Sequence, residues 1–161
     1  MLNVLQEQLG DVHGLAMAAS ETVDRVESRV LARELRRRLD ELRLDAAEIR
    51  GRCLEAGRSY GEELAAEIRA RANTVGEKAA DLAGAWFKAG TGPLEAWSFL
   101  AMGEAGELSS WSALHSLAEP EGELGELAAW GVEVQRRHLE LVLEGSSLLA
   151  ELLDPAGPRW G

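Results

Sequence analysis

The chain contains a single cysteine, Cys53, so it cannot form an internal disulfide bond. Disulfides are common in secreted proteins and rare in the cytosol, and we therefore expect a protein of the reducing cytoplasm. No segment approaches the roughly 20 consecutive apolar residues that a membrane-spanning helix needs. The first residues, Met1–Glu7, lack the basic start and the apolar run of a signal peptide. We expect a cytoplasmic protein without a membrane association.

Long basic stretches are missing as well. The formal net charge is −11, and the densest basic run, Arg33–Arg43, is interrupted by Glu34, Asp40 and Glu41. Such mixed charge is typical of a solvated helix face. Because nucleic-acid binding depends on neutralising phosphates, we expect no nucleic-acid partner. The chain also has no Cys-x-x-Cys pair, no phosphate-binding glycine loop and no Ser-His-Asp spacing.

Residues that favour β-strands are scarce, with one Tyr, two Phe and few Ile, whereas Ala, Leu, Glu and Arg dominate. This composition predicts an all-α protein. Apolar residues at steps of three and four predict a first helix over Leu2–Val23, a turn at Val26–Val30 and a second helix from Leu31 to just before Gly57. Residues 59–88 keep the same spacing, with Leu82 among the apolar residues expected to face the bundle, so the connection that follows is expected to be helical.

The second half of the chain predicts another helical hairpin. A break at Ala89–Pro93 precedes a helix that runs to about Ala118, and the short turn Glu119–Gly122 leads to a helix over 124–152. The connection before this hairpin is expected to bend at Thr74–Gly76. We expect one domain, residues 1–153, and a short tail containing Pro and Gly, residues 154–161.

The last helix carries Gln135 and His138 three residues apart on its apolar stripe. Side chains at this spacing share one face of a helix, so both are expected to point into the bundle while Arg136 and Arg137 face water. Glu104 lies on the apolar stripe of the preceding helix. An inward carboxylate combined with an acid-x-x-His pair is the arrangement with which helical bundles build half of a two-metal site.

On these residues the chain resembles the ferritin-like superfamily, which contains ferritins and rubrerythrins. The resemblance implies a ferritin-like antiparallel four-helix bundle with a long helical crossover connection. In that family each hairpin supplies one inward Glu and one Glu-x-x-His pair to a di-iron centre. The corresponding positions in this chain are Asp11, Leu42 and Asp45 in the first hairpin, and Glu104, Gln135 and His138 in the second.

The match to the family's ligand set is incomplete. Leu42 cannot bind a metal, Asp45 replaces a histidine, and Gln135 offers a neutral oxygen where the family has a bridging carboxylate. The metal ligands that the resemblance implies are Glu104, Gln135, His138, Asp11 and Asp45, with Glu107 one turn from Glu104 as a partial substitute. Iron or another divalent metal would be the cofactor of such a site. In the alternative interpretation these side chains only hydrogen-bond one another inside the bundle.

The function that we expect is a ferritin-like domain with a degenerate metal centre, acting as a binding, scaffolding or assembly protein and not as an enzyme. A ferritin-like di-iron oxidase or iron-storage protein is one alternative, and a helical regulatory adaptor is another. Self-association is expected because such domains commonly self-associate. The tryptophans outside the predicted core, Trp130 and Trp160, are candidate anchors for a protein partner.

Overall fold

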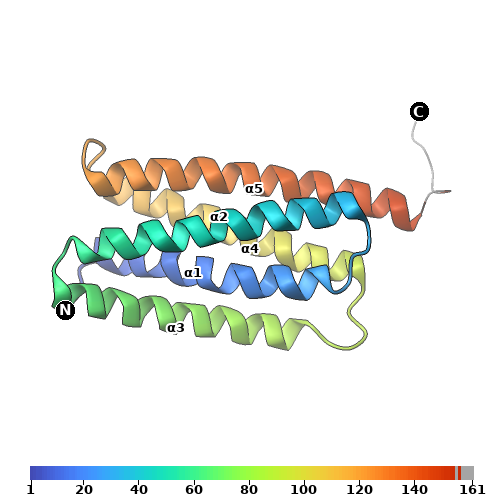
Figure 1. Ribbon diagram of the computed structural model, residues 1–161, viewed down its shortest axis with the longest axis horizontal. Coiled ribbons are helices and arrows are strands. Elements are labelled where there is room, and N and C mark those ends of the chain that lie inside the picture. The colour runs from blue at the N-terminus through green and yellow to red at the C-terminus, as the bar shows by residue number, and fades with distance from the viewer. Residues whose placement is uncertain (155, 157–161) are drawn as a thin grey trace.

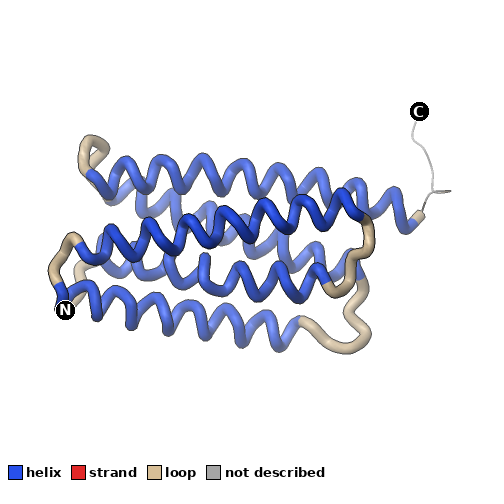
Figure 2. The backbone as a smooth tube through the Cα atoms, in the orientation of Figure 1, coloured by secondary structure: helices blue, strands red, loops and turns tan. Residues whose placement is uncertain are grey.

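The computed structural model describes residues 1–154 and 156. In this part of the chain there are five α-helices and no strand (Figures 1 and 2). The helices are α1 (Val4–Glu27), α2 (Arg33–Arg58), α3 (Glu62–Trp86), α4 (Pro93–Leu117) and α5 (Glu123–Leu153). The all-α prediction is confirmed. Trp160 and most of the predicted tail lie outside the described residues, within which no helix is long and apolar enough to cross a membrane.

The bundle consists of α1, α2, α4 and α5, and α3 lies outside it. α1 packs against α2 and α4, and α5 packs against the same two helices. α3 packs along the outer side of α1 and also contacts α2. α1, α3 and α5 run in one direction, and α2 and α4 run in the other (Figure 1). The connecting helix α3 therefore returns the chain along the length of the bundle before the second hairpin begins.

Local sequence signals explain where the helices begin. The Asn3 side chain accepts a hydrogen bond from the backbone N–H of Gln6, and the Gln6 side chain accepts one from the backbone of Asn3, so α1 starts with a complete capping box. Gly61 precedes α3 as its N-terminal cap, and its φ of 89° favours glycine. α4 starts with Pro93, which suits a first helical turn because its missing N–H would have no helical partner.

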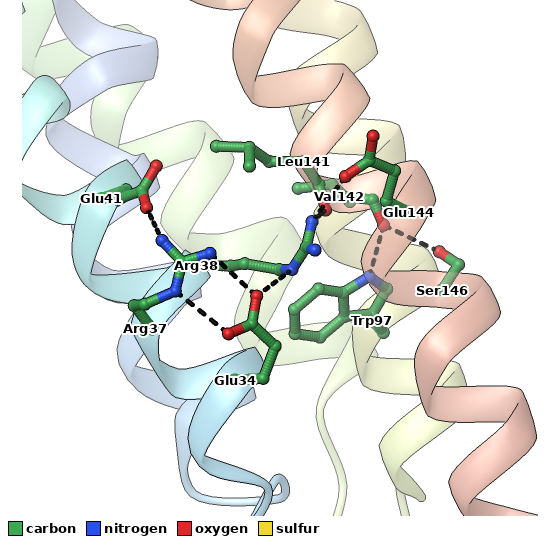
Figure 3. Close-up of polar contacts among 9 residues, drawn as sticks. All are labelled: Glu34, Arg37, Arg38, Glu41, Trp97, Leu141, Val142, Glu144 and Ser146. Carbon is green, nitrogen blue, oxygen red and sulfur yellow. Dashed lines mark hydrogen bonds and ion pairs between the residues drawn. The ribbon is translucent and has the colours of Figure 1, made fainter.

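Two tryptophans on α4 fill the contact with α5. Trp97 and Trp111 are fully buried, and each ring lies directly over a glycine of α5, Gly145 and Gly131 respectively. The indole N–H of Trp97 donates a hydrogen bond of 2.8 Å to the carbonyl of Val142 (Figure 3). The glycines leave the space that the rings occupy, so the two helices approach closely.

A largely buried arginine joins α2 to α5 near the same place. Arg38 donates to the carbonyl of Leu141 and to the carboxylate of Glu144, both at 3.0 Å (Figure 3). Glu34, one turn earlier on α2, pairs with Arg38 at 3.2 Å. Together with the tryptophan contacts, these bonds fix the register of α5 against its two neighbours.

Three local expectations need correction. The bend predicted at Thr74–Gly76 is absent, because α3 continues unbroken from Glu62 to Trp86 and Gly76 packs against Gly14 of α1. Gly57 does not end α2, which continues to Arg58. Leu82, which continues the apolar stripe of α3, is 61% exposed, because α3 contacts the bundle on one side only.

Candidate interior polar site

Five of the predicted site residues meet inside the bundle. We call them the interior polar cluster: Asp45 on α2, Glu104 and Glu107 on α4, and Gln135 and His138 on α5. Gln135 and His138 are each 1% exposed, whereas Arg136 and Arg137 are exposed. The predicted orientation of α5 is confirmed.

His138 lies between two carboxylates. Its Nδ1 is 3.3 Å from Oε2 of Glu104, and its Nε2 is 2.7 Å from Oδ2 of Asp45. Burial alone would lower the pKa of His138, but the hydrogen bonds and charges of Glu104 and Asp45 outweigh burial and raise the pKa above its ordinary value of 6.5. The geometry therefore favours an imidazolium that donates a hydrogen bond from each ring nitrogen.

Asp45 connects this pair to the surface. Its Oδ2 also accepts a hydrogen bond of 2.6 Å from the guanidinium of Arg137. Partial burial opposes ionisation of Asp45, but the hydrogen bonds to His138 and Arg137 outweigh this effect and lower the pKa of the carboxyl below 3.8. The sequence predicted that Arg137 faces water, and it does, but it reaches back to Asp45. Its role depends on the position of α2, which the spacing on α5 does not reveal.

Glu107 and Gln135 complete the cluster with fewer partners. Burial, and then the charge and the hydrogen bond of Glu104, raise the pKa of the Glu107 carboxyl well above its ordinary value, while Gln135 opposes this shift by hydrogen bonding. The side-chain oxygen of Gln135 is buried without a hydrogen-bond donor. At this end of the cluster the Gln135 oxygen is thus an acceptor that no donor of the described residues reaches.

The structure does not bring Asp11 into the cluster. The carboxylate of Asp11 forms a two-point ion pair with Arg71 of α3, with N–O distances of 2.6 and 3.1 Å. Asp11 lies on the side of α1 that faces α3, so the neighbouring helix uses the carboxylate as a surface partner. Leu42, at the other family position, is buried in the apolar core beside Leu39.

The residues present do not fit a two-metal centre. A ligating imidazole needs a free lone pair, and both ring nitrogens of His138 face carboxylates of this chain. Asp11 and Leu42 contribute no ligand from the first hairpin. Among residues 1–154 and 156, no group of three or more His, Cys, Asp or Glu side chains is arranged to hold a metal ion.

The remaining histidines and the cysteine lie elsewhere. His115 is exposed, and His13 is buried beside a cavity of about 300 Å³ that Cys53 also lines. Burial, and then the charge of Arg50, lower the pKa of His13. Burial raises the pKa of the Cys53 thiol to about 12, so the thiol is not poised to act as a nucleophile.

Trp130 is half-buried and already has a partner within the chain. The guanidinium of Arg52 on α2 lies 4.0 Å from the centre of its ring, a cation–π arrangement. The ring also packs against the core near Trp111. Trp130 is therefore less available to a protein partner than its position in the sequence indicated.

Comparisons of this chain with models of protein families, with curated proteins and with solved structures found no match.

Proposed function

We propose that the protein is a ferritin-like helical bundle with a degenerate metal centre, and that it acts as a binding or assembly protein. The layout supports this proposal: two antiparallel hairpins, α1–α2 and α4–α5, are joined by the long crossover helix α3. Ferritin-like folds have one such crossover connection. An inward carboxylate, Glu104, and an x-x-His pair, Gln135 and His138, occupy the corresponding helices.

The observation that carries the proposal is the double hydrogen bonding of His138. Glu104 and Asp45 occupy the positions around the imidazole that metal ions would need. A buried charge is tolerated when charges of opposite sign and hydrogen bonds compensate it. The cluster therefore links α2, α4 and α5 through hydrogen bonds and ion pairs. These contacts join the two hairpins in place of a metal.

The outer face of α4 supports an assembly role. The charged residues of α4 are Glu95, Glu104 and Glu107, and Glu104 and Glu107 are buried. The exposed side chains that step along this helix at intervals of three and four are small or apolar, and we call them the α4 stripe: Ser98, Met102, Ala105, Ser109, Ser112 and Ser116. Such spacing suits close packing against a second helix.

We propose that the α4 stripe contacts a second copy of this chain. The net charge of −11 opposes association of two copies across most of their surface. The α4 stripe has no charge, so two copies can meet there without repulsion, and a surface that packs on itself suits a two-fold dimer.

Iron loading tests the degenerate centre. After aerobic incubation with ferrous iron and desalting, we expect far less than one iron per chain, and a rate of ferrous oxidation equal to that of buffer. His138→Ala and the exposed control His115→Ala should both leave these values unchanged. Two irons per chain and rapid oxidation, both lost in His138→Ala but retained in His115→Ala, would favour a di-iron oxidase instead.

A further inference from the structure

A groove of about 340 Å³ lies between α1, α3 and α4. Its walls are mainly apolar and include the side chains of Leu15, Ala18, Ala19, Leu82, Phe99 and Leu100. Along α1 the lining extends from Leu15 to Thr22, which corresponds to about 10 Å of helix. Gly103 and Gly106 of α4 leave the groove open, because a Cβ atom at either position would have no neighbour within 4 Å.

One end of this groove is lined by a buried carboxyl group without a cationic partner. Glu107 is only 6% exposed, yet it lines the groove together with Glu104. The groups that interact with it are Glu104, which repels its charge and hydrogen-bonds to its protonated form, and the neutral amide of Gln135. Phe99, Leu82 and Thr22 line the groove two turns further along the bundle, so the groove has a polar end and an apolar end.

The charges of the cluster balance only while Glu107 keeps its proton, which its raised pKa favours. Glu104 and Asp45 share the cations of His138 and Arg137, and Glu107 is the third carboxyl group. The α1 and α3 residues that line the groove include no Lys, Arg or His. A bound monocation would therefore take the place of the Glu107 proton and neutralise the carboxylate that remains.

We infer that this groove binds an aliphatic primary amine, with the ammonium group at Glu107 and the hydrocarbon chain extended toward Phe99 and Leu82. An ammonium group offers three donors and one positive charge, which match the carboxylates at the polar end. The apolar walls bury the hydrocarbon chain. A metal ion would find two carboxylates and few further ligands, and an aliphatic carboxylate would be repelled by Glu104 and Glu107.

Calorimetric titration with n-octylamine, 1-octanol and octanoate, each below its aggregation concentration, tests the inference. We expect octylamine to bind the native protein at least tenfold more tightly than octanol, and octanoate not to bind. In Glu107→Gln, a neutral side chain of the same shape, the preference for the amine over the alcohol should disappear. Equal binding of amine and alcohol to the native protein, or an unchanged preference in Glu107→Gln, would overturn the inference.

A pair of glycine variants tests the location without touching Glu107. Gly103→Leu places a side chain in the groove, whereas Gly51→Leu makes the same change at an exposed position of α2 that also has open space around it. Octylamine binding should fall at least tenfold in Gly103→Leu and stay unchanged in Gly51→Leu. Binding that survives in Gly103→Leu, with both variants shown to be folded by circular dichroism, would place the amine elsewhere and refute the site.

Discussion

His138 shows how single side chains keep charge inside the bundle. Its ring is 1% exposed and has a carboxylate at each nitrogen. Because its pKa is raised above 6.5 in the folded protein, the imidazolium contributes stability below about pH 6.5, and this contribution is lost as the pH rises through the folded-state pKa. Asp45 has the opposite dependence, since its pKa is lowered below 3.8 and its contribution is lost as the pH falls through that lowered value.

We predict that His138→Gln lowers the free energy of unfolding by roughly 3 kcal/mol near pH 6, because a buried ion pair loses one partner. The loss should be smaller near pH 9, where the native imidazole is increasingly neutral. Urea denaturation at both pH values measures the difference. His115→Gln, at an exposed position, is the matched control and should show neither effect. A loss in His138→Gln that is the same at both pH values would contradict the charged assignment.

Between helices, the close contact of α4 with α5 depends on paired large and small residues. A Cβ atom at Gly131 would lie 2.1 Å from the ring of Trp111, and one at Gly145 would lie 2.3 Å from the ring of Trp97. Both rings are enclosed in the core, so neither can move aside easily in a densely packed interior. On the other side of the bundle, Gly14 has the same role between α1 and α3, where a Cβ atom would lie 2.4 Å from the carbonyl oxygen of Ala72.

We predict that Gly131→Ala destabilises the protein by about 1–3 kcal/mol, because overpacking outweighs the gain in helix propensity. Gly51→Ala makes the same substitution at an exposed helical position with no neighbour within 4 Å. That variant should be more stable than the native protein by about 0.5–1 kcal/mol. Urea unfolding of the two variants gives the comparison. Equal stabilisation by both substitutions would show that the contact between Trp111 and Gly131 is looser than the structure indicates.

The whole molecule carries a large negative charge that is unevenly distributed. The net charge is −11, yet Glu95 is the one exposed Asp, Glu, Lys or Arg of α4, which lies entirely within the described residues. Two copies that meet at the α4 stripe therefore bring few charges together, so the free energy of packing there can exceed the electrostatic repulsion between the copies. Salt screens this repulsion and weakens it further.

We predict that the native protein is a homodimer at micromolar concentration and that Ala105→Glu shifts it to the monomer. Each copy would then carry a carboxylate on its α4 stripe, and the two carboxylates would repel each other in the dimer. Ala47→Glu introduces the same charge on the exposed face of α2 and should leave the dimer intact. Light scattering measures the mass. A native mass that stays near 17.4 kDa on concentration would rule out the dimer.

The sequence alone determined the helices and the direction of most of their side chains. Each of the five predicted helical segments exists, with ends that differ from the prediction by a few residues, because helical periodicity and the glycine and proline signals are local properties. The same periodicity correctly placed Gln135 and His138 inside and Arg136 outside. The residue type of Leu42 likewise excluded it as a metal ligand, and the structure buries it in the apolar core.

The family resemblance grouped Asp45 with His138, but only the tertiary structure decided which polar groups pair with one another. Asp45 lies far from His138 in the sequence, and the two touch because α2 packs against α5. Asp11 was separated from the cluster because α3 packs beside α1 and presents Arg71 to it. The groove at Glu107 likewise needs three helices at once. Periodicity states which face of a helix is apolar, but it does not state which helix covers that face, and the pairing of charges depends on that choice.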